Sequence, residues 1–186
     1  MRKRGFEIIK KYKNKDINVP KRQTVRAAGY DFESAEDMII PSVWKKMAER
    51  VFTDQQGPLK ATLIPTGIKA YMLDDEYLQL SIRSGMSLKT GLMLANGVGI
   101  VDADYYNNSD NEGHIMFPVH NFGFKDKLIK KGERIGQGVF LNFLKVDGDK
   151  AAGQCNGGFG STGSDGKIQS IVVENDVEET LVANGK

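Results

Sequence analysis

Short apolar runs recur along the chain between turn residues, and their spacing is typical of β-strands. Phe6 and Ile8, for example, alternate with charged neighbours at period two, as in a half-buried strand. The pattern predicts strands at residues 6–9, 60–64, 67–72, 77–82, 98–101, 114–121 and 138–144. We therefore expect an all-β barrel or sandwich rather than a helical bundle.

One segment has helical spacing instead. Val43, Met47 and Val51 recur at every fourth position, after a Pro-Ser pair that favours a helix start and before a Gly-Pro pair that favours a stop. These residues predict a helix over residues 43–52. A second, shorter helical turn is predicted over residues 85–90.

The composition is that of one folded domain. The chain has 186 residues, of which 40% are hydrophobic and 27% charged. We expect the domain to occupy residues 1–150 and a glycine-rich lid and tail to occupy residues 151–186. No apolar stretch approaches the roughly 20 residues of a membrane-spanning helix, and the N-terminus lacks the apolar segment of a secretory signal. With a single cysteine, Cys155, these features predict a cytoplasmic protein without a membrane partner.

Positive charge is concentrated at the start of the chain. The net charge is +2, yet residues 1–26 hold ten Lys and Arg against only Glu7 and Asp16. Such an arm has the chemistry to bind nucleic acid phosphates. The alternation at Phe6 and Ile8 nevertheless favours a half-buried strand with solvated charges. We therefore expect no nucleic-acid partner.

Two features that suggest other chemistry lack the context they need. Residues 158–163 match G-x-G-x-x-G, but no predicted strand precedes them and no predicted helix follows. His114 and His120 lie six residues apart in a predicted strand, on one face but too far apart to chelate a metal as a pair. Neither feature supports a dinucleotide or a metal site.

Five short blocks occur together in one order. They are AGYD at 28–31, RSG at 83–85, NGVGIVDADY at 96–105, GERIGQ at 132–137 and GFGSTG at 158–163. In this order they resemble the trimeric dUTP pyrophosphatase (dUTPase) family, especially the type of Gram-positive bacteria and their phages. The resemblance implies a distorted jelly-roll β-barrel that forms a homotrimer with shared active sites. It also implies hydrolysis of dUTP to dUMP and pyrophosphate with Mg²⁺.

The second and fourth blocks offer groups that bind phosphate. Arg83 has a planar fork of donors that suits phosphate oxygens, Ser84 adds a hydroxyl, and Gly85 lets backbone approach a ligand closely. The resemblance implies that Ser84 contacts the oxygen bridging two phosphates and that Gln137 donates its amide to a phosphate. From the residues alone, a surface ion pair for Arg83 and a solvated Gln137 are the alternatives.

The third block opens with Asn96-Gly97, a strong hairpin-turn signal between apolar flanks, and Gly99 follows closely. An exposed hairpin backbone offers N–H and C=O groups that can pair with a pyrimidine edge. The resemblance implies that Asn96 and the backbone around Gly99 bind uracil. A plain structural hairpin is the alternative.

The same block ends with carboxylates and a tyrosine. On a strand, Asp102 and Asp104 would share one face and Tyr105 would take the other. The resemblance implies that Asp102 activates the water that attacks the α-phosphorus, with Asp104 in a structural role. It implies that Tyr105 packs beneath the deoxyribose and excludes a 2′-hydroxyl. Asp31 is implied to bind Mg²⁺ through water only, and a turn-capping Asp31 is the alternative.

The fifth block combines one aromatic ring with a glycine-rich backbone. The resemblance implies a lid in which Phe159 stacks on uracil, next to Gly160, while Ser161 and Thr162 supply donors to the terminal phosphates. A flexible linker is the alternative.

The chain also departs from the family pattern. Gln154 stands where the family usually has an arginine, and Lys150 is the candidate substitute. Residues 106–113 form an enlarged loop, and the helix predicted over 43–52 lengthens the spacing between the first two blocks. These departures leave two alternative functions open. One is a nucleotide-responsive regulator that binds a repressor-like protein partner, and the other is a dCTP deaminase-like sister enzyme.

Overall fold

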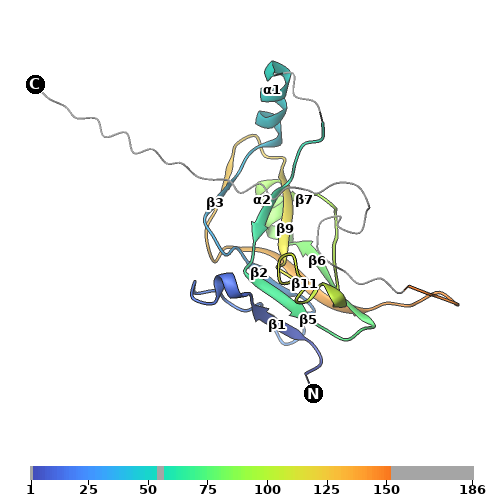
Figure 1. Ribbon diagram of the computed structural model, residues 1–186. Helices are drawn as coiled ribbons and strands as arrows, with labels where there is room; N and C mark the ends of the chain where they lie inside the picture. The colour runs from blue at the N-terminus through green and yellow to red at the C-terminus, as the bar shows by residue number, and fades with distance from the viewer. Residues whose placement is uncertain (1, 54–56, 152–186) are drawn as a thin grey trace, which may run out of the picture.

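The computed structural model describes residues 2–53 and 57–151, and strands dominate this part of the chain (Figure 1). The helices are α1 (Val43–Thr53) and α2 (Ser84–Thr90), with 3-10 turns η1 (Lys10–Tyr12) and η2 (Ala103–Tyr105). The strands are β1 (Gly5–Ile8), β2 (Tyr30–Glu33), β3 (Met38–Ile40), β4 (Thr62–Pro65), β5 (Ile68–Tyr71), β6 (Glu76–Ile82), β7 (Leu92–Leu94), β8 (Gly99–Asp102), β9 (Met116–Asn121), β10 (Lys127–Ile129) and β11 (Arg134–Asn142). The expectation of a mostly β protein is confirmed.

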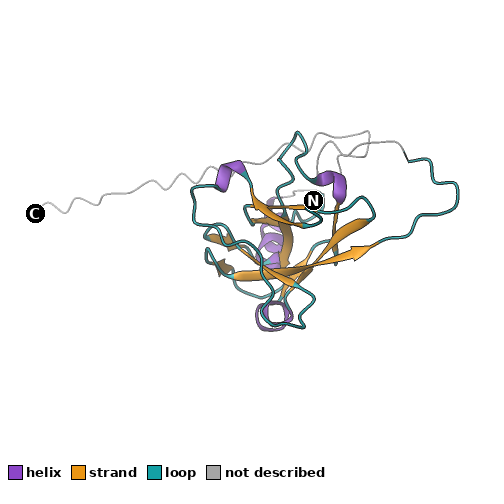
Figure 2. Cartoon of the chain, turned by 90° about the horizontal axis from the view of Figure 1, so that it is seen from below, coloured by secondary structure: helices purple, strands orange, loops and turns teal. Residues whose placement is uncertain are grey.

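The strands form several antiparallel sheets. The largest has the order β2-β11-β6-β8, a second has the order β4-β9-β7, and two strand pairs, β1-β5 and β10-β3, complete the described part. Seen from below, the strands lie in the middle of the molecule with loops around them (Figure 2). Strand β11 pairs with β2 on one side and with β6 on the other, so it ties three of the five sequence blocks together.

One buried apolar cluster joins the sheets. Phe32 of β2 and Phe117 of β9 are both fully buried, and their ring centroids lie 5.6 Å apart. Gly136 of β11 faces this ring, because a Cβ atom at position 136 would lie 2.0 Å from Phe117 Cε1. A side chain at position 136 would therefore force apart strands that supply the core.

Each of the seven predicted strands overlaps an observed one, but some predicted limits are wrong. Strand β11 begins at Arg134 rather than at residue 138. Gly136 and Gly138 look like turn residues in the sequence, but they lie in the strand, where Phe117 packs against Gly136 and Leu78 against Gly138. Strand β9 begins at Met116, so His114 lies outside the strand predicted for it. The short strands β2, β3, β7 and β10 were not predicted, since three or four residues carry too little periodicity.

Both predicted helices are confirmed, although α1 does not bury the face that predicted it. Helix α1 projects from the strands (Figure 1). Val43 is buried, but Met47 is 47% and Val51 81% exposed. Trp44 ties the helix to the body, because its indole N–H donates to the Phe122 carbonyl at 2.9 Å and its ring stacks on Phe124. In the described residues no helix is long and apolar enough to cross a membrane.

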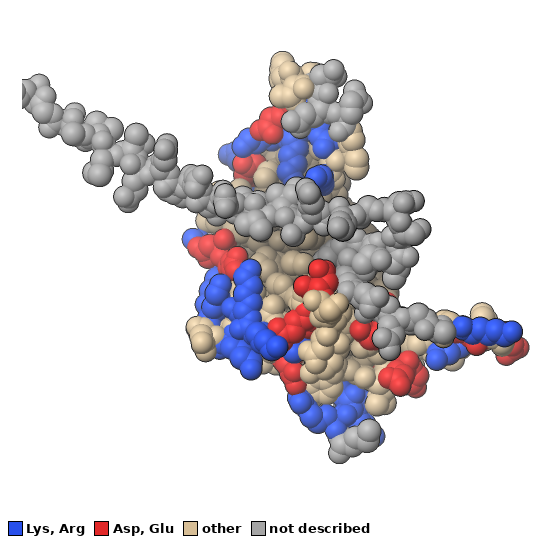
Figure 3. Space-filling model, in the orientation of Figure 1, with Lys and Arg blue, Asp and Glu red and all other residues tan. Residues whose placement is uncertain are grey.

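The basic start of the chain includes the strand that the alternation at Phe6 and Ile8 predicts, although only Gly5–Ile8 belong to it. Strand β1 pairs with β5, and each of its residues is half-buried. Arg2 pairs with Glu7 at 2.8 Å, and Arg4 pairs with Glu76. In the space-filling view of Figure 3, Lys and Arg side chains lie next to Asp and Glu side chains on the face of the molecule that is drawn. Carboxylates thus offset part of the positive charge.

Candidate active site

Two of the predicted site residues lie at opposite ends of strand β6, with Arg83 directly after its last residue and Asp102 beside its start. At its carboxyl end the chain turns into α2, and Arg83 is the capping residue of that helix. The Arg83 carbonyl accepts the amides of Met86 (2.9 Å) and Ser87 (3.1 Å), and the Arg83 amide donates to Ile135 of β11 at 3.3 Å. The backbone from which the Arg83 side chain extends is therefore fixed on both sides.

Two arginines surround one carboxylate at this end of β6. Arg83 Nε lies 3.4 Å from Asp31 Oδ1, and Arg134 Nη1 donates to Asp31 Oδ2 at 3.2 Å. Asp31 is buried, whereas the side chains of Arg83 and Arg134 are 34% and 42% exposed. Two cations around one anion leave one positive charge in excess, on guanidinium groups that solvent or an anionic ligand can reach. Asp31 lies in β2 rather than in a turn, so the turn-capping alternative is wrong.

Gln137 joins the same group. On β11 it lies opposite Asp31 of β2 and opposite Ser81 of β6. A Cβ atom at Gly29 would lie 2.5 Å from Gln137 Oε1, so the glycine of the first block makes room for this side chain. The structure thus brings together residues of the first, second and fourth blocks, and we call Asp31, Arg83, Arg134 and Gln137 the arginine end.

Arg134 was not predicted as a site residue. It stands in the fourth block, two residues after Gly132 and before the strand that the sequence predicts at 138–144. The pairing of β11 with β2 shifts register between Arg134 and Gly136. Such an irregularity redirects side chains, and the Arg134 side chain contacts the Asp31 carboxylate. The signal available in the sequence was the presence of an arginine inside a matched block.

Asp102 lies at the opposite end of β6. Strand β8 runs antiparallel to β6 with Asp102 opposite Tyr77 and Gly99 opposite Leu80. From Tyr77 to Arg83 the chain advances six residues, which is about 20 Å at the rise of a strand. Within one chain the structure therefore does not bring Asp102 together with Arg83.

The prediction that Asp102 and Asp104 share a strand is wrong. Strand β8 ends at Asp102, and the next three residues form η2, so Asp104 belongs to a helical turn. The Asp102 side chain reaches solvent, yet partial burial raises its pKa, and the negative charge of Asp104 raises it further. Tyr105 packs against the core, and its hydroxyl donates to the His114 carbonyl at 3.0 Å.

The turn at Asn96-Gly97 is present, but it does not close the predicted hairpin. Gly97 has a φ of 71°, and its amide donates to the Leu94 carbonyl at 3.2 Å. Strands β7 and β8 on either side of the turn belong to different sheets. The hairpin prediction fails because β8 pairs with β6 and not with β7. In that pairing Gly99 lies opposite Leu80, and a Cβ atom at position 99 would lie 3.0 Å from Leu80 Cβ. Packing against β6 therefore accounts for Gly99.

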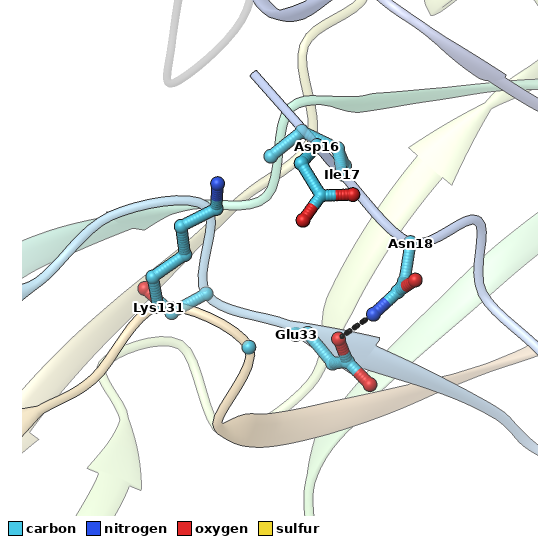
Figure 4. A pocket seen from close by; sticks show the side chains of 7 residues that line it. Asp16, Ile17, Asn18, Glu33 and Lys131 are labelled. Atoms are coloured by element: carbon cyan, nitrogen blue, oxygen red, sulfur yellow. Dashed lines mark hydrogen bonds between the residues drawn. The ribbon is translucent and has the colours of Figure 1, made fainter.

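Several predicted residues lie outside the described part of the chain, namely Phe159, Gly160, Ser161, Thr162 and Gln154. The candidate substitute Lys150 is described and is exposed. A pocket of about 220 Å³ lies beside β2, where Asn18 donates to Glu33 at 2.9 Å (Figure 4). None of the predicted site residues lines it.

The described residues fit a magnesium ion that arrives with a nucleotide better than a resident one. Within residues 2–53 and 57–151, no group of three or more His, Cys, Asp or Glu side chains is arranged to hold a metal ion. Both oxygens of Asp31 face arginines. Mg²⁺ usually keeps several waters and is bound through substrate phosphates with one or two carboxylates. One carboxylate beside phosphate-binding arginines is compatible with that mode.

At one end of β6 two arginines offer charged donors that suit anionic oxygens, and at the other end Asp102 reaches solvent from a strand of the same sheet. A family model described as dUTPase matches residues 15–163, a span that includes all five blocks. The chain belongs to the dUTPase family.

Relatives and solved structures agree with this assignment. A deoxyuridine 5'-triphosphate nucleotidohydrolase of Lactococcus lactis is 47% identical over 166 residues, which cover 88% of this chain and all of that protein. The Caulobacter vibrioides enzyme of the same name is 33% identical over 81% of this chain and 88% of its own length. The crystal structure of a Streptococcus mutans dUTPase superposes with a TM-score of 0.65 at 42% identity, over 77% of this chain and 99% of that one. A Staphylococcus bacteriophage 80alpha dUTPase, at 18% identity and a TM-score of 0.59 over 81% of this chain and 97% of its own, shares the fold.

Proposed function

We propose that this chain hydrolyses dUTP to dUMP and pyrophosphate, with Asp102 activating the attacking water. Membership of the dUTPase family gives the dUTP nucleotidohydrolase activity. The observation that carries the proposed site is the arginine end, where residues of the second and fourth blocks converge on Asp31 of the first block. We infer from this convergence that the first, second and fourth blocks together bind phosphate.

The arginine end binds the triphosphate in this proposal. Arg83 presents a fork of donors to phosphate oxygens, and Arg134 adds a second cation at the same carboxylate. Ser84 contacts the bridging oxygen, Gly85 leaves the approach open, and Gln137 donates its amide. A Cβ at Gly85 would meet nothing within 4 Å, so packing does not explain that glycine.

The active site is formed between copies of the chain, in a homotrimer of distorted jelly-roll barrels. The separation of about 20 Å along β6 supports this assembly. A general base must lie within hydrogen-bond reach of the water that it activates. Asp102 of one copy therefore serves a nucleotide whose phosphates are bound by Arg83 of another.

The other end of β6 acts on the α-phosphate and binds the nucleoside through Asp102, Tyr105 and the turn at Asn96. Asp102 takes a proton from the water that attacks the α-phosphorus, and its raised pKa makes it a better proton acceptor than an ordinary aspartate. The Tyr105 ring packs beneath the deoxyribose, where a 2′-hydroxyl would collide with it. Asn96 and the backbone around Gly99 bind the uracil edge.

One described carboxylate could serve a Mg²⁺ ion that is bound to the substrate phosphates. Asp31 is the described carboxylate that would hold its waters, and the ion would supply positive charge that offsets the triphosphate. Each Asp31 oxygen faces one arginine nitrogen and could also accept a hydrogen from such a water, because an ionised carboxylate has about four acceptor sites on its two oxygens.

Residues 1–150 form the β domain in this proposal, and residues 151–186 supply a lid and tail. Phe159 stacks on uracil, while Gly160, Ser161 and Thr162 lie over the phosphates. Gln154 removes a charged contact to the γ-phosphate, and Lys150 or Arg134 compensates for it. The single cysteine of the chain supports a cytoplasmic location.

The two alternative functions have less support. The enlarged loop at 106–113 and Gln154 are the two departures that favour a regulator with a repressor-like partner. In the structure Asn107 and Glu112 of this loop instead bind Lys69 of the same chain. The relatives named above are dUTP nucleotidohydrolases, which favours dUTP hydrolysis over dCTP deamination.

A substrate panel tests the proposal. With Mg²⁺ present, we expect pyrophosphate release from dUTP and little from dTTP, dCTP or UTP. Ammonia release from dCTP would instead indicate the deaminase. Absence of pyrophosphate release from dUTP by the folded, oligomeric protein would contradict the proposed function.

A further inference from the structure

The loop at residues 106–113 folds back onto the hydroxyl of Tyr105. Asn111 Nδ2 donates to the Tyr105 hydroxyl oxygen at 2.8 Å, and that hydroxyl donates to the His114 carbonyl at 3.0 Å. A phenol hydroxyl has one hydrogen to donate. Both contacts together therefore fix the direction of the hydroxyl and the tilt of the ring.

The orientation of the Asn111 amide is itself determined. Its Oδ1 accepts from the amides of Gly113 at 3.1 Å and His114 at 3.2 Å, and from Asn108 Nδ2 at 3.0 Å. Three donors converge on one oxygen, so a flipped amide would set its NH₂ group against N–H donors. Only the observed orientation leaves Nδ2 facing Tyr105.

Buried and charged contacts hold the loop against the body. Lys69 of β5 is 7% exposed, and its ammonium donates to Asn107 at 2.6 Å and to Glu112 at 2.7 Å. Tyr106 donates to Glu7 of β1 at 2.7 Å. Both strands of the β1-β5 pair are thus attached to the loop on either side of Asn111.

The far end of the loop is fixed by a buried histidine. His114 Nε2 accepts the Gly67 amide at 3.0 Å. Gly113, directly before it, has a φ of 80°, and a Cβ there would lie 2.7 Å from the Tyr105 carbonyl oxygen. The carbonyl that accepts the Tyr105 hydroxyl therefore cannot move without disturbing this packing.

We propose that Asn111 is a positioning residue that sets how well the enzyme rejects ribonucleotides, because it holds the Tyr105 ring beneath the sugar. This inference rests on the proposed function, in which the ring excludes a 2′-hydroxyl. A ring that is free to tilt leaves room for that hydroxyl, whereas a ring held at its hydroxyl does not. Loss of one neutral hydrogen bond corresponds to roughly a fivefold to tenfold change in an equilibrium.

The test compares kcat/KM for dUTP and UTP in the full chain. Asn111→Asp keeps the Oδ1 acceptor that closes the loop and sets a second acceptor against the Tyr105 hydroxyl. The single hydrogen of that hydroxyl can then serve either the new carboxylate or the His114 carbonyl, so one of the two contacts that fix the ring is lost. We expect the dUTP-over-UTP ratio to fall about tenfold. Tyr105→Phe, which keeps the ring and the loop, should lower the ratio by a similar factor. Adding Asn111→Asp to Tyr105→Phe should then lower it no further.

Matched controls separate this effect from charge and from folding. Asp110→Asn changes an exposed neighbour in the same loop, and we expect it to leave the ratio unchanged. The swap Asp110→Asn with Asn111→Asp keeps the loop charge constant and should behave like Asn111→Asp alone. If Asn111→Asp does not fold, Tyr105→Phe still tests the hydroxyl.

The outcomes are distinct. A wild-type enzyme that does not cleave dUTP overturns the proposed function. A wild-type enzyme that cleaves dUTP selectively, with the ratio of Asn111→Asp within twofold of it, overturns the role of Asn111. An equal loss from Asn111→Asp in the Tyr105→Phe background also overturns that role, since a general loop defect would not need the hydroxyl.

Discussion

The two ends of β6 fix their side chains by different physical means. At the arginine end, Arg83 and Arg134 are held against the buried carboxylate of Asp31. At the other end, neutral hydrogen bonds hold Tyr105, and Asp102 reaches solvent from the last residue of β8. Under the proposed function, charge pairing suits a group that attracts a triphosphate, and neutral hydrogen bonds suit a ring that fits a sugar. The comparison then means that one chain supplies two half-sites with separate tasks.

The largest expected effect is at Asp102. Asp102→Asn removes the proton acceptor and keeps the size of the side chain, so pyrophosphate release should fall by about 10²- to 10⁴-fold. Binding of dUTP, measured by calorimetry with Mg²⁺, should persist because the arginine end is untouched. Asp104→Asn serves as the control and should keep its turnover at neutral pH. Equal rates for wild type and Asp102→Asn would remove Asp102 from its assigned role.

The Tyr105 end should lose stability in acid. Burial lowers the pKa of His114 from 6.5 to about 4, and the positive charge of Lys11 adds to the shift. As pH falls from 6.5 towards 4, the unfolded chain binds a proton that the folded chain does not, so the free energy of unfolding falls by about 3 kcal/mol. Urea unfolding at a fixed protein concentration measures this loss. His114→Gln, which keeps an acceptor for Gly67, should reduce it, and an unchanged pH dependence would argue against His114.

Removing a cation from the arginine end should weaken substrate binding. Arg83→Ala takes away a charged donor and should raise the KM for dUTP about tenfold, with a smaller change in kcat. Arg83→Lys restores the charge without the planar fork and should recover part of the loss. Lys89→Ala removes an exposed charge from the same helix α2 and should have little effect. A KM for Arg83→Ala equal to that of wild type would contradict the phosphate role.

The smallest expected effect is a shift of the pH profile. Asp104 raises the pKa of Asp102 by its negative charge. Asp102 must be deprotonated to accept a proton, so activity falls as pH drops through its pKa. Asp104→Asn should therefore move the acid limb of kcat/KM to lower pH. A limb that stays in place or moves to higher pH would show that Asp104 does not act on Asp102 in the working enzyme.

The sequence predicted the strands with clear periodicity and most of the residues at the two ends of β6. It placed the start of β11 too late, because Gly136 and Gly138 signal turns unless the positions of Phe117 and Leu78 are known. It predicted α1 from an apolar repeat that turned out to be largely exposed. Burial of a helix face depends on what packs against it, which a local pattern does not contain.

In the site too, residues could be found from short sequence blocks, but contacts between distant parts of the chain could not. Arg83 and Gln137 were found because each stands in a short block, and the structure brings them beside Asp31. Arg134 was missed because only the register shift on β11 gives its contact with Asp31. The contact between Asn111 and Tyr105 depends on how the whole loop closes, so spacing alone did not reveal it.

The most direct test of the shared site mixes two inactive variants. Chains carrying Asp102→Asn and chains carrying Arg83→Glu are co-expressed in equal amounts, and the hybrid oligomers are purified together. If each site takes Asp102 from one copy and Arg83 from another, about a quarter of the sites combine both native residues, and the mixture should regain about a quarter of the wild-type rate. A mixture no more active than its two parents would mean that both residues act from the same chain, which would contradict the arrangement inferred from the two ends of β6.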